Sequence, residues 1–206
     1  MMIVYTVGMK YAIGIDEVGR GPIAGPVVVC ACAVMEGTDI LSLFPKGVLK
    51  DSKKLSEKIR NEIVQKVEQL VLGKKVVYGI GEVSAKSIDE IGINPAINEA
   101  IADALTKLHT QGVGKDSFIY LDGALHVPVI YQQETIIKGD EKISEIAIAS
   151  IIAKVYRDNM MKSLARTLPD YGFENHVGYG TPAHYEAIEK HGMTEHHRRS
   201  FLKRIL

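Results

Sequence analysis

Cysteine is scarce in this sequence, and the few that occur fit a hydrophobic core. Among 206 residues only Cys30 and Cys32 are cysteines, two positions apart in an apolar run, so both would lie on one face of a strand. The sequence contains neither a disulfide framework nor the CxxC pattern of a zinc site. This scarcity favours an intracellular, reducing environment.

An excess of charge is also missing. The chain carries 25 basic and 25 acidic residues, and its formal net charge is zero. Proteins that coat nucleic acid are usually basic overall, which argues against a coating protein. An enzyme that gathers its acidic residues at a metal site, with basic residues around that site, stays compatible. Residues 46–60 hold six Lys or Arg against two Asp or Glu, although most such charge runs are solvated surface.

Long hydrophobic runs are absent as well. No apolar stretch reaches the roughly 18 residues that a membrane span needs. Tyr5, Thr6, Gly8 and Lys10 interrupt what would be the apolar region of a signal peptide. The sequence shows no internal repeat and no linker. We therefore expect a soluble cytoplasmic protein with one domain over residues 1–206, in which residues 168–206 form a tail of loops with a helix near 181–190.

The hydrophobic pattern predicts a mixture of strands and helices. Predicted strands cover 10–18, 27–34, 75–83 and 117–123, with further strand material in 127–138. The first two strands are separated by a Gly/Pro-rich turn, which is typical of a hairpin. Predicted helices cover 56–71, a segment that starts at the cap Asn94 and Pro95, and 143–165. This order indicates an α/β or α+β domain with a mixed sheet flanked by helices.

Four acidic residues follow apolar strand segments. Asp16 and Glu17 come at the end of the first strand, Asp122 ends IYLD, and Asp140 ends ETIIKGD. Because burying an acid is costly, an acid in such a position needs a reason. For any one of them alone, a turn-capping aspartate is the simpler explanation.

Three strand ends that each carry an acid suggest a shared site. If the strands are neighbours in one sheet, the carboxylates converge, and such hard oxygen ligands favour Mg²⁺ or Mn²⁺. Two ions could then support phosphodiester hydrolysis. Adjacent strand residues point to opposite faces, so the strand must end or bulge at Asp16 and Glu17 for both to reach one site. Gly19 and Gly21 make a bulge plausible.

The turn after the first strand matches a dinucleotide-binding pattern that its context contradicts. Residues 19–24 (GRGPIA) fit GxGxxA, but a Val-rich strand follows, whereas the dinucleotide motif requires the glycines to open a helix. The glycines could instead let the backbone approach a sugar hydroxyl, with Arg20 on a phosphate. A 2′-hydroxyl is the group that distinguishes RNA from DNA. A tight hairpin turn is the alternative without function.

The last part of the chain is rich in histidine. Five of seven histidines follow residue 175, but their spacing matches no standard zinc pattern and no cysteine lies there, so surface, capping or phosphate-contact roles are favoured over a zinc site. Tyr179 lies between two glycines in HVGYGT and could stack on a sugar or base. An isolated tyrosine is more often structural.

The motifs taken together resemble those of ribonuclease HII. The matching segments occur in the family's order and cover about residues 10 to 201; they are GIDEVGRGPIAGPVV (14–28), KDSKKLS (50–56), IYLDG (119–123), KGDEK (138–142), ASIIAKVYRD (149–158), YGFENHVGYGT (171–181) and HRRSF (197–201). DExGRG is the specific motif among them, and the HRRSF segment is similar to that of bacterial members. The resemblance implies a ribonuclease H-like fold with a central mixed sheet.

The resemblance also implies roles for particular residues. It assigns metal binding and catalysis to Asp16, Glu17, Asp122 and Asp140, with Mg²⁺ or Mn²⁺ as the cofactor. Recognition of the 2′-hydroxyl falls to Gly19, Arg20 and Gly21, and stacking on the deoxyribose to Tyr179. Contacts to the nucleic-acid backbone fall to Ser52, Lys53 and Lys138.

The implied activity is endonucleolytic cutting on the 5′ side of a ribonucleotide, leaving 5′-phosphate and 3′-hydroxyl ends. The substrates would be RNA/DNA hybrids and DNA duplexes with embedded ribonucleotides. We expect a monomer. The short end after HRRSF carries no visible sliding-clamp motif, and no additional N-terminal domain of the ribonuclease HIII kind precedes the first strand. The alternative is a non-catalytic nucleic-acid-binding module with the same fold.

Overall fold

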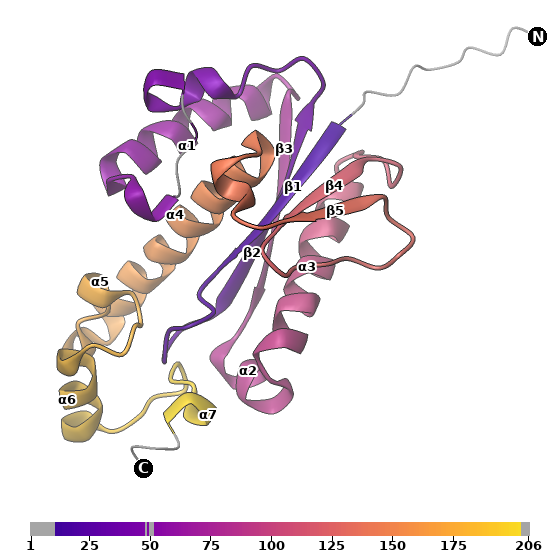
Figure 1. Ribbon diagram of the computed structural model, residues 1–206. Coiled ribbons are helices and arrows are strands. Elements are labelled where there is room, and N and C mark those ends of the chain that lie inside the picture. Colours follow the sequence, from indigo (N-terminus) through magenta and orange to yellow (C-terminus); the bar gives the residue numbers. More distant parts are fainter. Residues whose placement is uncertain (1–10, 48, 50–51, 203–206) are drawn as a thin grey trace, which may run out of the picture.

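The computed structural model describes residues 11–47, 49 and 52–202 and contains one mixed sheet (Figure 1). Its five strands lie in the order β3-β2-β1-β4-β5. Their bounds are Tyr11–Val18 (β1), Val27–Met35 (β2), Val76–Val83 (β3), Phe118–Asp122 (β4) and Gln133–Ile136 (β5). The predicted mixed sheet is thereby confirmed.

The strands fall into an antiparallel and a parallel half. β2 pairs antiparallel with both β1 and β3, as the Gly/Pro-rich turn predicted for the first two strands. β1, β4 and β5 run parallel, with Ile15 opposite Leu121 and Asp122 opposite Ile136. Parallel neighbours end at the same edge of a sheet, so the C-terminal ends of these three strands lie side by side.

Helices cover both faces of the sheet (Figure 1). On one face lie α1 (Glu57–Leu72) and α4 (Ser144–Thr167), whose apolar residues form a core with Val28, Cys30 and Cys32. On the other face, α3 (Ile93–Thr110) contributes a second core. Gly14 lets α4 lie directly on β1, because a Cβ there would collide with the backbone of Glu145.

Three details of the sequence-based prediction were wrong. A short helix, α2 (Ala85–Ile91), precedes α3, and α3 begins at Ile93 after Gly92, so Asn94 is not its cap. Asn94 instead accepts a hydrogen bond from Nη2 of Arg20 at 2.7 Å. Most of 127–138 is loop, because only Gln133–Ile136 joins the sheet.

The tail folds back against the turn that joins β1 to β2. It contains α5 (Phe173–His176), α6 (Pro182–His191) and α7 (Arg199–Leu202), and short 3-10 turns occur at Leu41–Leu43, Pro45–Gly47, Ser52–Lys54, Gly139–Glu141 and Pro169–Tyr171. His197 pairs with Ala24 in an isolated antiparallel bridge. Within the described part of the chain, every helix is too short or too polar to cross a membrane.

Candidate active site

Two carboxylates meet where neighbouring parallel strands end. Asp122 is the last residue of β4. Ile15 of β1 is paired with Leu121 of β4, and Asp16 and Asp122 are the next residues on these two parallel strands, so the two aspartates lie beside each other. Asp140 does not follow its strand directly as predicted, because β5 ends at Ile136. A 3-10 turn, Gly139–Glu141, carries Asp140, and the amide of Gly139 donates to Oδ1 of Asp122 at 2.6 Å. This bond ties the turn to the sheet edge.

The prediction that the strand ends or bulges at Asp16 and Glu17 is wrong. β1 stays regularly paired through Val18, with Asp16 opposite Cys30 and Glu17 opposite Val29. Residues directly opposite each other share a face, and Cys30 belongs to the α4 core whereas Val29 belongs to the α3 core. The two acids therefore leave the strand on opposite faces, close to its C-terminal end.

Negative charge is crowded at this edge. The pKa of Asp16, which is 7% exposed, lies well above its usual value, because burial disfavours the charged form and because Glu17 and Asp122 are close. The pKa of Glu17 is raised by burial, against the opposing effect of Arg20, with Asp122 adding to the rise. Nη1 of Arg20 lies 3.4 Å from Oε1 of Glu17. Within the described part of the chain, no basic side chain forms an ion pair with Asp16 or Asp122.

The donor set fits a hard divalent cation. Asp16, Glu17 and Asp122 offer carboxylate oxygens, which Mg²⁺ and Mn²⁺ prefer, and a cation would stabilise the charged forms that burial and mutual repulsion disfavour at Asp16 and Glu17. In residues 11–47, 49 and 52–202, no three Asp, Glu, His or Cys side chains already form a complete ligand group. Asp16, Glu17 and Asp122 interact electrostatically, but an ion would have to draw the carboxylates closer to be held by them.

Two buried arginines hold the Gly-rich turn after β1, and the sequence analysis missed both. Arg198 is 0% exposed and donates to the carbonyls of Gly19 (2.6 Å), Arg20 (3.2 Å) and Gly25 (3.0 Å). Burial lowers its pKa to about 9, so it stays charged at neutral pH. The nearby Arg157 acts similarly: it is 0% exposed and binds three carbonyls, of Ala24, Pro26 and Val177. The RR and VYRD segments contain these residues, but a surface arginine is the usual expectation.

The same turn meets the tail at Tyr179. Gly19 has a φ of +91°, and a Cβ on it would collide with Arg157. Gly21 is exposed, and a Cβ on it would lie 3.9 Å from Cε1 of Tyr179, whose side chain is 41% exposed. No helix follows these glycines, because the chain passes directly into β2. This geometry excludes the dinucleotide motif, and it places the ring of Tyr179 beside the exposed backbone of Gly21.

The three residues predicted to contact a nucleic-acid backbone lie in different environments. Ser52 is 4% exposed, and its hydroxyl accepts a hydrogen bond from the hydroxyl of Ser150 at 3.0 Å; Ser150 lies close enough to Asp16 to lower the pKa of that carboxyl, against the larger effect of burial. The side chain of Lys53 lies outside the described part of the chain. Lys138 is exposed, with a left-handed φ of 54° next to the turn that carries Asp140. Ser52 is therefore linked to the carboxylates from within, through Ser150.

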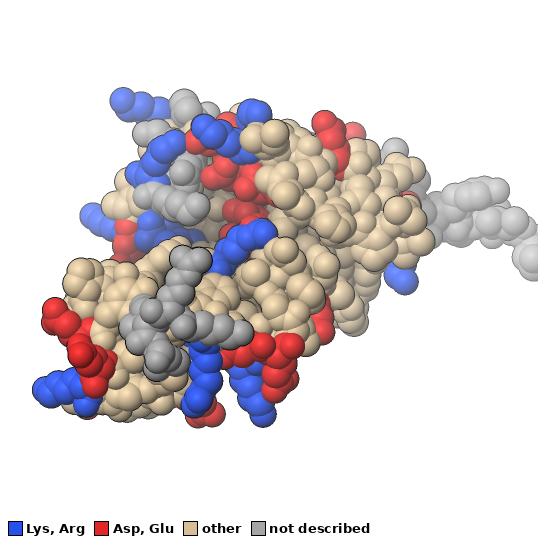
Figure 2. Space-filling view, turned by 60° about the horizontal axis from the view of Figure 1, so that its bottom comes forward, with Lys and Arg blue, Asp and Glu red and all other residues tan. Residues whose placement is uncertain are grey.

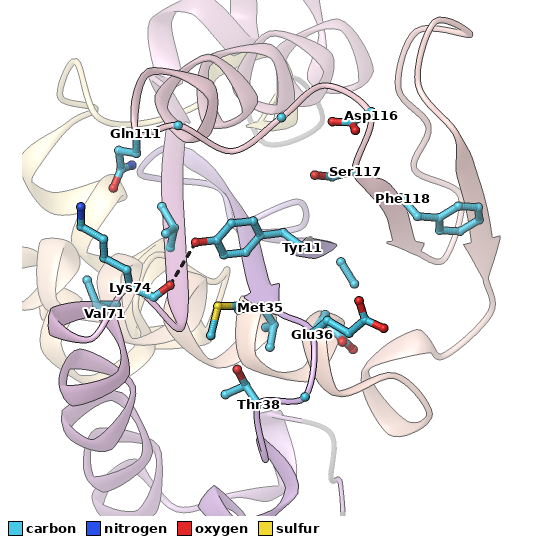
Figure 3. Close-up of a pocket in the computed structure, with 17 residues that line it drawn as sticks. Tyr11, Met35, Glu36, Thr38, Val71, Lys74, Gln111, Asp116, Ser117 and Phe118 are labelled. Carbon is cyan, nitrogen blue, oxygen red and sulfur yellow. Dashed lines mark hydrogen bonds between the residues drawn. The ribbon is translucent and has the colours of Figure 1, made fainter. Parts of the chain in front are cut away.

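The predicted metal-binding acids and the large cavity lie in different parts of the molecule. Figure 2 shows acidic side chains in a hollow of the surface, with Lys and Arg side chains beside them. A cavity of about 1310 Å³ lies instead at the opposite end of β1, where Tyr11 and Met35 line it and Tyr11 donates to the carbonyl of Lys74 at 3.0 Å (Figure 3). None of the four predicted metal-binding acids lines that cavity. The predicted metal-binding acids therefore lie outside this cavity.

Comparison with known proteins agrees with this geometry. Residues 13–204 match the family model described as ribonuclease HII. The ribonuclease HII of Bacillus thuringiensis (strain Al Hakam) is 46% identical over 194 residues, which cover 94% of this chain and 70% of the relative. The ribonuclease HII of Bacillus cereus (strain Q1) is 45% identical with the same coverage.

Solved structures show the same fold. The ribonuclease H2 of Pyrococcus horikoshii OT3 superposes with a TM-score of 0.77 at 25% identity, covering 95% of this chain and 96% of that one. The ribonuclease HII of Archaeoglobus fulgidus, solved in complex with PCNA, gives a TM-score of 0.67 at 26% identity, over 92% and 93% of the two chains. A ribonuclease HIII named Bst-RNase HIII, solved with Mn²⁺, gives 0.66 at 20% identity, over 97% and 71%, and supports the fold alone.

Proposed function

Because this chain belongs to the ribonuclease HII family and is a ribonuclease H-type endonuclease, we propose that Asp16, Glu17, Asp122 and Asp140 hold its divalent metal ions. The observation that carries this proposal is the adjacent placement of Asp16 and Asp122 at the ends of two parallel strands. Among the described residues, no basic side chain forms an ion pair with Asp16 or Asp122. Mg²⁺ or Mn²⁺, two ions in the active complex, suits oxygen ligands of this kind.

The substrates that we propose are RNA/DNA hybrids and DNA duplexes with embedded ribonucleotides. Bound divalent ions would supply the Lewis acid that activates water and stabilises the departing 3′-oxygen. Cutting on the 5′ side of the ribonucleotide leaves 5′-phosphate and 3′-hydroxyl ends. The chain's own part is to hold the carboxylates in place, through the strand ends and the amide of Gly139, which donates to Asp122.

Recognition of the ribonucleotide falls to the turn that the buried arginines hold. Gly19, Arg20 and Gly21 present backbone groups that can hydrogen-bond a 2′-hydroxyl, and the absence of a side chain at Gly21 leaves room for the sugar. Tyr179, beside Gly21, can stack on the neighbouring deoxyribose. Lys53 and Lys138 would contact phosphates, and through Tyr179 the tail would take part in substrate binding. The chain would act as a monomer in the cytoplasm.

A cleavage assay tests the proposal. The substrate is a labelled DNA duplex with one ribonucleotide, incubated with Mg²⁺, with Mn²⁺ or with chelator. We expect metal-dependent cutting 5′ to the ribonucleotide by the wild type and none by Asp16→Asn. Asp103→Asn is a matched control, because Asp103 lies exposed on α3 in an ion pair with Lys107. Tight binding without cutting under either metal would replace the proposal with the non-catalytic module.

A further inference from the structure

His184 and His197 are buried in the tail, and each of their four ring nitrogens has a partner. The side chains are 0% and 2% exposed. Nδ1 of His184 lies 2.9 Å from the carbonyl oxygen of Tyr179, and the two Nε2 atoms lie 3.2 Å apart. Nδ1 of His197 lies 2.9 Å from the amide nitrogen of Thr194 and 2.9 Å from its hydroxyl. The two rings thus connect the segment before HRRSF to the loop that carries Tyr179.

The partners at the two ends allow one arrangement of protons. A backbone amide only donates, so Nδ1 of His197 is an acceptor and its proton sits on Nε2. A carbonyl only accepts, so Nδ1 of His184 carries a proton and its Nε2 is an acceptor. The Nε2–H of His197 therefore donates to Nε2 of His184. The chain of bonds is complete only when both rings are neutral.

The surroundings keep both rings neutral at pH 7. Burial lowers the pKa of His197 to about 4, with His184, His196 and His176 adding to the effect. Burial also lowers the pKa of His184, and His176, stacked on it at 4.3 Å between ring centroids, lowers it further. The rings of Tyr171 and Phe173 cover the remaining sides.

The chain of hydrogen bonds ends at the carbonyl of Tyr179. The carbonyl of Tyr179 also accepts from the amide of Thr181 at 2.9 Å, and the carbonyl of Gly178 accepts from the amides of Ile23 (2.9 Å) and Ala24 (3.2 Å). The backbone is therefore held on both sides of Tyr179, while its ring stays exposed beside Gly21. A fixed backbone at Tyr179 fixes the point from which its ring extends toward Gly21.

We propose that His184 and His197 are positioning residues that lock the carbonyl of Tyr179 and thereby set the preference for a ribonucleotide–deoxyribonucleotide junction over a continuous RNA/DNA hybrid. This inference rests on the proposed substrate and on the proposed role of Tyr179. The histidines act through Tyr179 and do not touch the nucleic acid. Their contribution therefore belongs to substrate discrimination and not to the chemical step at the carboxylates.

The first measurement reads the protons directly and needs no activity. NMR spectra of the full chain labelled with ¹⁵N-histidine distinguish the two neutral tautomers and the charged ring. At pH 7 we expect the Nδ1–H form for His184 and the Nε2–H form for His197. The opposite tautomer at either residue, or a charged ring, would overturn the proposal whatever the enzyme cuts.

The second measurement uses a matched pair of variants. In His184→Asn the side-chain amide can still donate to the carbonyl of Tyr179, whereas in His184→Gln it reaches the position of Nε2 and leaves that carbonyl without its second donor. We expect His184→Gln to lower the ratio of kcat/KM for the junction to that for a continuous hybrid by roughly fivefold, the loss of about one hydrogen bond. His184→Asn should stay within about twofold, and kcat on the continuous hybrid should be unchanged in both.

Each outcome decides the question. If His184→Gln does not fold, His197→Asn keeps an acceptor for Thr194 but removes the donor that fixes the tautomer of His184, and it should shift the ratio in the same direction. Folded variants with an unchanged ratio, or with equal losses on both substrates, would overturn the positioning role. A wild type that cuts neither substrate would refute the proposed function, and with it the effect on specificity, while the tautomers would still show whether the chain of bonds exists.

Discussion

Arg198 offers the sharpest test of how the Gly-rich turn is held. Its guanidinium is fully buried and donates to the carbonyls of Gly19, Arg20 and Gly25. Replacing it in Arg198→Met keeps an apolar side chain of similar length but leaves these three carbonyls without their donor. Two of them belong to the turn that we propose recognises the 2′-hydroxyl, so both stability and substrate recognition should suffer.

The magnitude follows from the number of bonds lost. Each hydrogen bond contributes about 1 kcal/mol net, because the cost of removing its partners from water has already been subtracted. Three such bonds give a loss of about 3 kcal/mol in the free energy of unfolding. For a chain of this size each kcal/mol lowers Tm by about 2–4 °C, so we expect a decrease of roughly 6–12 °C. Arg198→Lys should fall between, since one ammonium cannot reach three carbonyls in the geometry of a guanidinium.

Thermal unfolding followed by circular dichroism measures this loss, and Arg199→Met is the control. Arg199 is the next residue and is exposed, and its hydrogen bond to Asp89 is donated by its backbone amide. The same substitution there should therefore change Tm by only a degree or two (about 0.5 kcal/mol). Cleavage of the single-ribonucleotide duplex, measured below both transitions, should fall only in the Arg198 variant. Equal Tm values for the two methionine variants would refute the idea that Arg198 holds the turn.

Three further predictions concern the same region. Metal-free Asp16→Asn should be more stable than the wild type by about 1–3 kcal/mol in urea unfolding, because the substitution removes a buried, repelled charge; a destabilised variant would contradict the electrostatics of the site. Gly21→Ala should leave Tm within about 2 °C of the wild type and lower cleavage, whereas Gly19→Ala should lower Tm, because Gly19 has a φ of +91° and no room for a Cβ. A larger decrease of Tm in Gly21→Ala than in Gly19→Ala would refute these roles. Folding lowers the pKa of His197 from 6.5 to about 4, so the unfolded chain binds a proton there more readily, and the free energy of unfolding should fall by up to about 3 kcal/mol as the pH drops from 6.5 to 4. In His197→Asn the free energy of unfolding should depend less on pH over this interval; an unchanged pH dependence would show that His197 is not buried in its neutral form.

Much of the candidate site could be predicted because its residues follow local patterns. The alternating and continuous apolar segments located β1, β2, β3 and β4, and acids after such segments are unusual enough to stand out. Asp16 and Asp122 were predicted to converge on the condition that their strands are neighbours, and the parallel pairing of β1 with β4 meets that condition. The expected bulge was wrong because Asp16 and Glu17 reach the edge from opposite faces of a regular strand.

The amino-acid sequence by itself determined where the strands and the long helices lie and which acids end those strands, because periodicity and burial cost act over a few neighbouring residues. Only the tertiary structure decided what Arg157, Arg198, His184 and His197 do. Their partners are mostly backbone carbonyls and amides, and every residue of the chain offers such groups, so no side-chain pattern marks which carbonyl a buried arginine or histidine will meet. That choice is made when the tail folds against the turn after β1 and brings segments more than a hundred residues apart within hydrogen-bonding distance.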